Sequence, residues 1–171
     1  MHVELLNRPP ISGTIPERLY DAVGDCTWVR FTPADGAPWA GAFGRGGVAQ
    51  HNAAVPFADG RYVLVVIAGG RGYVVDAGDG ALRFRTTSDL LEGAVPVLER
   101  DLVAAWGWTD LWVMGPNAER WDADVALDGI ENVTATADAV RGEAWQGDGW
   151  HAFTLDLDGW RLHYGPLVRA G

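Results

Sequence analysis

Two stretches of the chain, residues 72–86 and 150–165, carry the same pattern of apolar and charged residues. Matching side chains recur at a spacing of 80 positions in four pairs: Tyr73 and Phe153, Asp76 and Asp156, Leu82 and Leu162, and Phe84 and Tyr164. A third, similar pair of strands around a turn at Pro116–Asn117 falls near the midpoint between them. The spacing divides into units of about 40 residues, and self-similarity at such a period predicts a repeated supersecondary unit.

Turn signals predict that these units are made of strands. The dipeptide Asp-Gly occurs six times, at residues 35–36, 59–60, 79–80, 128–129, 148–149 and 158–159, and several copies separate alternating or β-branched runs. Both residues of such a turn adopt positive φ at low cost, which suits short hairpins. Helical signals are confined to residues 16–23, with Pro16 near a first turn, and to a single turn begun by Ser88. We therefore predict an all-β chain with one short N-terminal helix.

The turns also predict which residues face each other across each hairpin. Each hairpin is expected to have an apolar face directed inward, and two of them a polar face on which an acid stands opposite an arginine. The expected pairs are Phe153 with Tyr164, Leu155 with Leu162, Asp156 with Arg161, Val75 with Phe84, Asp76 with Arg83, and Trp112 with Trp121. A calcium loop at Asp76 is excluded, because the alternate positions carry Gly78 and Gly80, which have no side-chain oxygen.

The stretch DAGDGALRF, residues 76–84, resembles the repeat of quinoprotein (PQQ-type) β-propellers. That repeat reads Asp-Ala-x-Thr-Gly with a tryptophan four residues later, and Phe84 stands at the place of the tryptophan here. The stretch LDLDGWRLHY is similar but one residue shorter before its glycine, and VIAGGRGY weakly resembles a kelch blade. The resemblance implies blade-like sheets of four antiparallel strands. The quinone of that family sits on the axis of a full ring, so we transfer no cofactor to this chain.

The repeats predict one all-β domain over residues 1–171. Residues 1–48 form an N-terminal segment with the short helix and a hairpin, and residues 49–87, 94–125 and 130–165 form blade-like units. Closed rings commonly take four to eight blades, or roughly 160 to 340 residues at this period. The three to four units are therefore expected to form an open arc, a compact four-unit arrangement, or half of a homodimer that completes a propeller. A two-sheet β-sandwich is the alternative.

Charge restricts the class of partner. The 171 residues include 23 acidic and 13 basic side chains, for a net charge of −10. This charge disfavours DNA and RNA, whose phosphates require a cationic face, and makes a basic protein the natural partner. The single cysteine and the lack of an apolar run in the first thirty residues lead us to expect a cytoplasmic protein without signal peptide or membrane span.

A glycine-rich stretch around residues 44–52 is a candidate ligand loop. Arg45, His51 and Asn52 lie in it or beside it, and its backbone amides could hold an anion. A phosphate loop would open a helix, whereas Pro56 and the neighbouring Val-Ala run predict a strand, so a β-bulge or tight connector is the competing interpretation. The four histidines are scattered singly, without metal-ligand spacing, and no metal site is predicted.

The stretch AAWGWTDLW, residues 104–112, is the predicted binding surface. Trp106 and Trp108 have the same strand parity, and Gly107 between them would leave the backbone open to a partner. With Asp101 and Asp110 as neighbouring acids, the indoles are expected to form part of a partner-binding surface. The alternative is that both indoles fill a core between sheets.

Three classes of function fit these observations. A non-catalytic module that binds another protein is favoured, because no catalytic set is assembled, and a cytoplasmic immunity protein that masks a basic toxin would fit this description. The alternatives are a small-molecule or carbohydrate binder that uses tryptophan platforms, and an enzyme with a site near His51. A groove lined by tryptophan would favour the small-molecule binder, and a broad acidic and aromatic patch would favour the protein binder.

Overall fold

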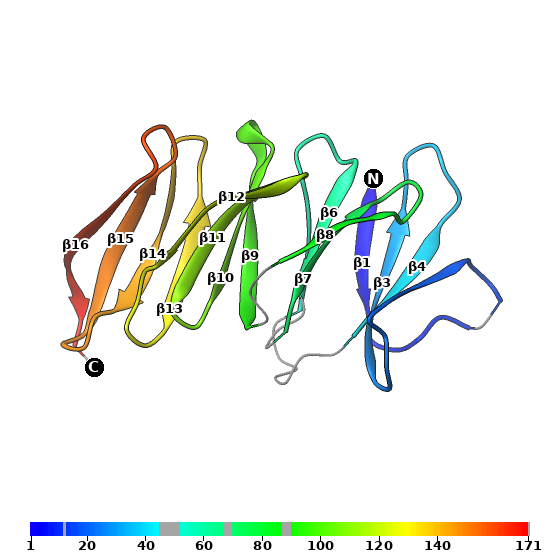
Figure 1. Ribbon diagram of the computed structural model, residues 1–171, viewed down its shortest axis with the longest axis horizontal. Helices are drawn as coiled ribbons and strands as arrows, with labels where there is room; N and C mark the ends of the chain where they lie inside the picture. Colours follow the sequence, from blue (N-terminus) through cyan, green and yellow to red (C-terminus); the bar gives the residue numbers. More distant parts are fainter. Residues whose placement is uncertain (12, 45–51, 67–69, 87–89, 171) are drawn as a thin grey trace.

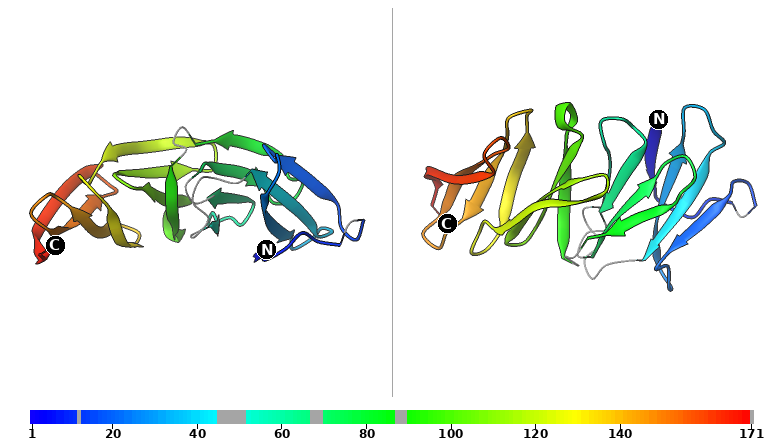
Figure 2. Two further views of the ribbon diagram at one scale, coloured as in Figure 1. Left: turned by 90° about the horizontal axis from the view of Figure 1, so that it is seen from below. Right: turned by 45° about the horizontal axis from the view of Figure 1, so that its top comes forward.

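The computed structural model describes residues 1–170 except 12, 45–51, 67–69 and 87–89. Its strands form four sheets of four strands each, and the sheets stand side by side in an arc (Figures 1 and 2). We call the sheets blades 1 to 4 in chain order. The only helix among the described residues is one 3₁₀ turn, η1 (Leu98–Arg100).

The sixteen strands divide evenly among the blades. Blade 1 contains β1 (His2–Leu6), β2 (Glu17–Tyr20), β3 (Cys26–Thr32) and β4 (Trp39–Gly44), and blade 2 contains β5 (Ala53–Pro56), β6 (Tyr62–Val66), β7 (Gly72–Asp76) and β8 (Leu82–Arg85). Blade 3 contains β9 (Leu91–Val97), β10 (Leu102–Gly107), β11 (Asp110–Gly115) and β12 (Ala118–Asp124), and blade 4 contains β13 (Ile130–Ala135), β14 (Ala139–Trp145), β15 (Trp150–Asp156) and β16 (Arg161–Arg169).

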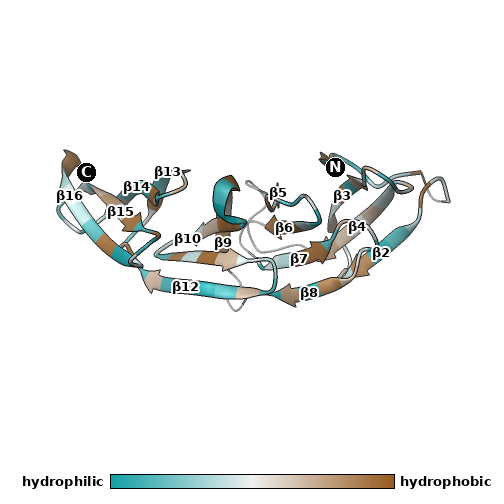
Figure 3. Ribbon diagram, turned by 90° about the horizontal axis from the view of Figure 1, so that it is seen from above, coloured by the Kyte–Doolittle hydropathy of each residue, from teal (hydrophilic) through white to brown (hydrophobic). Residues whose placement is uncertain are grey.

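Blades 2, 3 and 4 share one connectivity. In each of them, consecutive strands pair antiparallel in chain order. Figure 3 shows the outermost strands β8, β12 and β16 on the convex side of the arc and β5 and β13 on the concave side. The first strands of neighbouring blades contact each other, β5 with β9 and β9 with β13. The predicted all-β architecture of four-strand, blade-like units in an open arc is confirmed, and the two-sheet sandwich is excluded.

Blade 1 departs from this order, because β2 and not the last strand lies at its outer edge. β2 pairs parallel with β4, so the helix predicted over residues 16–23 is wrong. The edge of β4 offers unpaired backbone groups, and the segment satisfies them: the amide of Ala40 donates to the carbonyl of Pro16 at 2.9 Å. Tyr20 is then buried and stacks on Phe43, with ring centroids 4.6 Å apart. Long-range pairing has overridden the local helical signal.

Three apolar cores fill the spaces between neighbouring blades. The core between blades 1 and 2 is rich in aromatic rings, including Phe31, Phe43 and Tyr73. The cores between blades 2 and 3 and between blades 3 and 4 are mostly aliphatic, with Leu64 in the former and Leu155 in the latter. Each sheet therefore buries its apolar face against a neighbour, as stacked repeats do.

Hydrogen bonds repeat at the three junctions between blades. Every junction has at least one bond whose acceptor lies in the turn between the third and fourth strands of the following blade. The bonds are Trp39 Nε1 to Ala77 O at 2.7 Å, Tyr20 Oη to Gly80 O at 2.5 Å, Arg83 to Asn117 Oδ1 at 2.9 Å, and Arg100 to Leu157 O at 3.4 Å and to Asp158 Oδ1 at 2.5 Å. The same place in the repeat thus fixes each blade to the next.

Burial of the Tyr20 side chain makes stability depend on alkaline pH. Burial raises the pKa of Tyr20 from 10.0 to about 12. Above pH 10 the unfolded chain loses a proton that the folded chain keeps, so the free energy of unfolding should fall between pH 10 and pH 12, by up to about 2–3 kcal/mol. We expect the Tyr20→Phe variant to be less stable at neutral pH and to lose much of the decrease in stability between pH 10 and pH 12. Burial also raises the pKa of Tyr73, which should cause part of the decrease that remains. Urea titrations of both proteins at pH 7, 9 and 11 test this, and equal pH dependence would contradict it.

The register predicted for the last hairpin is confirmed. Its cross-strand pairs are Phe153 with Tyr164, Leu155 with Leu162, and Asp156 with Arg161. Phe153 and Leu155 are fully buried, whereas Tyr164 near the open edge of β16 remains 48% exposed and donates its hydroxyl to the carbonyl of Val125 at 2.7 Å.

Two other predicted registers are wrong: in blade 2 the slip is two residues at Val75 and one residue beyond a bulge, and in blade 3 a bulge produces a slip of one residue. In blade 2 the pairs are Val75 with Leu82 and Val74 with Phe84, and in blade 3 they are Trp112 with Asp122 and Val113 with Trp121. The blade 2 turn is longer than two residues: the amide of Asp76 donates to the carbonyl of Ala81 at 2.9 Å. The Asp76 carboxylate bonds Arg61 at 3.0 Å in place of Arg83. The helical turn predicted from Ser88 is also wrong where it is described, since Leu91 begins β9.

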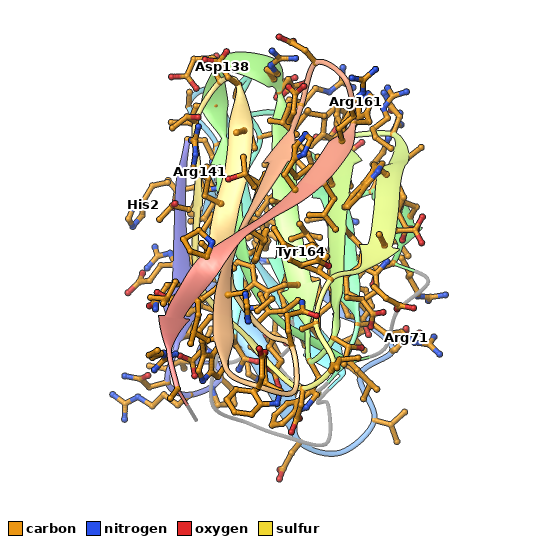
Figure 4. The ribbon with its side chains drawn as sticks, turned by 90° about the vertical axis from the view of Figure 1, so that its left-hand side faces the viewer. His2, Arg71, Asp138, Arg141, Arg161 and Tyr164 are labelled. Atoms are coloured by element: carbon orange, nitrogen blue, oxygen red, sulfur yellow. The ribbon has the colours of Figure 1, made fainter. Side chains whose placement is uncertain are left out.

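The outward face of blade 4 carries a polar cross-strand row, although β16 also exposes Leu167 and Val168. Figure 4 looks onto this end of the arc, with Arg141 on β14 and Arg161 on β16. Arg141, Thr154 and His163 lie in one cross-strand row, on the side opposite to the buried Leu155. A sheet that carries charged and hydroxyl side chains on its free face suits the end of an arc that meets water. Completion of a ring by a second copy of the chain stays a prediction.

Candidate functional site

A groove lined by three tryptophans lies at the junction of blades 3 and 4. Its cavity has a volume of about 400 Å³ and is lined by Glu92, Trp108, Asp128, Gly129, Ile130, Glu131, Trp145 and Trp150. We call these eight residues the tryptophan groove. They come from the start of β9, the β10–β11 turn, the connection from β12 to β13, the start of β13, and the β14–β15 hairpin, which meet at the lower edge of the arc in Figure 1.

Two of the indoles are fixed by strand pairing within blade 4. Trp145 ends β14 and Trp150 begins β15, and the two residues are direct cross-strand partners. Their ring centroids lie 6.0 Å apart and their planes cross at 72°. The turn between them contains Gly147 and Gly149, both with positive φ. A tight turn thus holds two large aromatic surfaces nearly perpendicular to each other.

The third indole comes from blade 3 and is tied to the connection that leads into blade 4. Trp108 is 54% exposed, and its indole Nε1 donates a hydrogen bond to Asp128 Oδ1. The carbonyl of Trp108 accepts from the amide of Gly129 at 3.1 Å, and the carbonyl of Gly129 accepts from the amide of Trp145 at 3.1 Å. Backbone bonds therefore link both hairpins to one segment, which fixes the spacing of the groove walls.

A second cavity continues the groove along the first strands of the blades. It has a volume of about 560 Å³ and is lined by Asn52, Ala53, Glu92, Gly93, Ala94, Trp106, Ile130 and Glu131. Glu92, Ile130 and Glu131 line both cavities. Together the two cavities offer a partner an extended path from the tryptophans of blade 4 to the start of β5. We call the second cavity the inner groove.

The tryptophan groove is acidic. Glu92, Asp128 and Glu131 contribute carboxylates, and none of its lining residues is basic among the described part of the chain. Arg169, at the end of β16, lies beside it: the guanidinium pairs with Glu131 and stands 4.4 Å from the ring centroid of Trp150. Arg169 Nε also lies 3.3 Å from Glu143, as an ion pair without hydrogen-bond geometry. Three carboxylates beside indole faces favour a cationic ligand.

Comparison with known proteins establishes the fold. No family model matches the chain, and no curated protein matches it at a significant level. Similar solved structures include dihydro-heme d1 dehydrogenase NirN in complex with DHE (TM-score 0.60, 16% identity, 84% of this chain and 33% of that chain), the RRP9 WD40 repeats (0.59, 11%, 95% and 53%) and BamB from Moraxella catarrhalis (0.59, 14%, 98% and 52%). The fold is that of β-propeller blades. The chain spans about half of the latter two structures and a third of the first.

The predicted tryptophans both line these cavities of the propeller-type arc, but they do so in different ways. Trp108 stands in the tryptophan groove, whereas Trp106 is half-buried, packs against the core between blades 3 and 4, and lines the inner groove. Gly107 does not open the backbone to a partner as expected. It is buried, and a Cβ there would lie 2.7 Å from the carbonyl oxygen of Leu90.

Neither of the two predicted acids lines the tryptophan groove or the inner groove. Asp101 precedes β10, at the strand end opposite to Trp108, and adopts a left-handed conformation with φ of 51°. Asp110 begins β11 beside the groove without lining it, opposite Asp124. Burial raises the pKa of Asp110, and the hydrogen bond and charge of Asp124 raise it further.

The predicted ligand loop is described only at its end. Arg45 and His51 lie outside the described residues. Asn52 lines the inner groove, and its side-chain amide donates to Thr27 Oγ1 at 3.0 Å. Within the described residues, no group of three or more His, Cys, Asp or Glu side chains is placed to hold a metal ion. The described chain also contains no helix that is both long and apolar enough to cross a membrane.

Of the eight groove residues, sequence reasoning predicted Trp108 alone and missed the other two indoles and all three carboxylates, namely Trp145, Trp150, Glu92, Asp128 and Glu131. A signal for the two indoles was present, because the stretch WQGDGW places a tryptophan on each side of an Asp-Gly turn. In the repeat, this turn is equivalent to the β10–β11 turn that carries Trp108, since each joins the second and third strands of its blade. Residues at equivalent turns of adjacent blades are neighbours in space.

Proposed function

We propose that the protein is a non-catalytic binding module that recognises a protein partner through the tryptophan groove and the inner groove. The observation that carries the proposal is the exposed indole of Trp108 at an acidic cavity that Trp145 and Trp150 also line. Exposed tryptophans in a preformed hollow are typical anchors of protein interfaces, because each buries a large area at low entropic cost.

The charge of the domain supports a basic partner. The net charge is −10, and the groove itself carries three carboxylates. Such a field would speed encounter with a cationic surface, in a way that salt weakens. An immunity-type role in the cytoplasm, in which the domain masks a basic toxin, is one form of this function.

A small-molecule or carbohydrate binder is the second candidate, and one observation favours it. The tryptophan groove has a volume of about 400 Å³, which lies within the range of about 300–1,000 Å³ typical of ligand pockets. Two features favour the protein partner instead. The hollow continues into the inner groove, and the 72° angle between Trp145 and Trp150 makes a corner, whereas a sugar ring would stack on a flat aromatic platform.

Trp108→Ala tests the proposed function. The dissociation constant for the partner should rise by a factor of roughly 30 or more, because a central aromatic anchor can account for about 2 kcal/mol or more of binding. Its melting temperature should change little, since the side chain is 54% exposed. The measurement is retention of binding proteins on the immobilised domain, followed by affinity measurement with the purified partner.

Trp160→Ala is the matched control, because Trp160 is also partly exposed, at 37%, but lies in the turn between β15 and β16 at the opposite edge of blade 4. It should bind like the unmodified protein. A partner bound equally well by the Trp108→Ala variant would overturn the assignment of the groove, and a collapsed melting temperature of that variant would show that Trp108 is structural.

A further inference from the structure

We propose that the tryptophan groove receives a single cationic side chain of the partner, an alkylammonium or a guanidinium group. This inference rests on the proposed function and specifies the chemistry that the groove recognises. It draws on three features of the groove: the arrangement of its indoles, the charge of its lining, and a guanidinium that the fold holds against two of the same residues.

The indoles offer aromatic faces to a cation. Trp145 and Trp150 meet at 72° with centroids 6.0 Å apart, which makes a corner with two walls. Trp108 enters from the neighbouring blade, and its bond to Asp128 fixes the indole edge. A cation within about 6 Å of an indole face is attracted by the ring quadrupole, and aromatic corners of this kind also exclude water from the alkyl part of a side chain.

The lining supplies the charge that would stabilise such a group. Glu92, Asp128 and Glu131 line the cavity. Asp128 accepts from an uncharged indole, and Glu131 is compensated by Arg169. Glu92 has no ion-pair partner among the described residues. The groove therefore keeps an excess of negative charge after its internal contacts are made.

Arg169 shows how these residues hold a cation. Its guanidinium lies over Trp150 at 4.4 Å from the ring centroid and pairs with Glu131. Both of these residues also line the cavity, whereas Arg169 does not. Arg169 thus already occupies Glu131 and Trp150 with the kind of stacking and charge contacts expected for a cation, which leaves Glu92, Asp128 and the other two indoles of the lining for a partner's side chain. A cavity of about 400 Å³ fits one long side chain better than a folded element.

Nuclear magnetic resonance of the indole N–H groups in the full chain tests the proposal. The probes are the N-acetyl amides of lysine, trimethyllysine and arginine, and of norleucine as the uncharged control. The signals of Trp108, Trp145 and Trp150, assigned by single Trp→Phe replacements, should shift with the cationic probes and not with norleucine. Trp39, which is 4% exposed in the core between blades 1 and 2, should not respond. The order of affinity among the three cations identifies the preferred group.

A charge-removing pair of variants separates groove contacts from the general acidity of the domain. Glu92→Gln should weaken binding of the preferred cation roughly 2- to 5-fold, because it removes one charge of a solvent-accessible ion pair, whereas Glu99→Gln, in η1 at the opposite end of β9, should leave it unchanged. Shifts of equal size with norleucine, no shift of the three indoles with any probe, or equal effects of the two variants would each overturn the proposal. Trp108-dependent retention of a protein partner would still support the proposed function in those cases.

Discussion

Replacing Phe43 by alanine is expected to lower the free energy of unfolding by about 3–5 kcal/mol, the largest effect of any change considered for this protein. Phe43 is fully buried in the core between blades 1 and 2. Its ring stacks on Tyr20 at 4.6 Å and lies 5.3 Å from Tyr73 and 6.5 Å from Phe31, measured between centroids. Truncation removes all three aromatic contacts and leaves a cavity that two sheets, fixed by their own strand pairing, cannot fill.

Urea unfolding followed by tryptophan fluorescence measures this loss. Leu19→Ala is the matched control, because Leu19 lies next to Tyr20 on β2 but is 70% exposed. It should cost about 0.5 kcal/mol or less. A small cost for Phe43→Ala would mean that blades 1 and 2 do not share this core, whereas a large cost for Leu19→Ala would mean that the outer face of β2 is covered.

Leu155→Ala is expected to cost about 2–5 kcal/mol, while Asp156→Ala, one residue further along the same strand, should cost about 1 kcal/mol or less. Leu155 is fully buried in the core between blades 3 and 4. Asp156 is half-buried, stands opposite Arg161, and accepts from the amide of Asp158 at 3.0 Å. The same denaturant experiment compares the two variants, and equal losses would contradict the opposite orientation of the two side chains.

Features set by neighbouring residues could be predicted from the sequence, and features set by distant segments could not. The strands and the repeat follow from alternation and from Asp-Gly turns, which are local. The register of the β15–β16 hairpin was predicted correctly. The register of the β7–β8 hairpin was not, because it depends on a turn that is longer than two residues and that the Asp76 side chain helps to close. Strand β2 forms because it pairs with the free edge of β4. That pairing partner is distant in the sequence and cannot be predicted from residues 16–23 alone.

The candidate site follows the same rule. Trp108 was predicted because it lies close in sequence to Trp106, yet its partners in the groove come from the next blade. Trp150 lies 42 positions after Trp108, which is close to the length of one repeat. The repeat length therefore predicts that the turns carrying these two residues lie side by side in adjacent blades. Asp101 is close to Trp106 and Trp108 in the sequence, but it precedes β10 whereas Trp108 follows it, so the length of the strand separates the two residues.

The placement of all three cores between neighbouring sheets has a consequence for how the arc opens. A stack of this kind behaves as a linear array, in which each unit is held only by the units beside it. The inner blades have two such neighbours and the end blades have one, so either end blade, blade 1 or blade 4, should detach before the whole arc unfolds. The tryptophan groove takes its walls from blades 3 and 4 together. A ligand bound in the groove would therefore stabilise the junction between blades 3 and 4. Hydrogen exchange of the backbone amides of blade 4 should then be slower in the presence of the ligand.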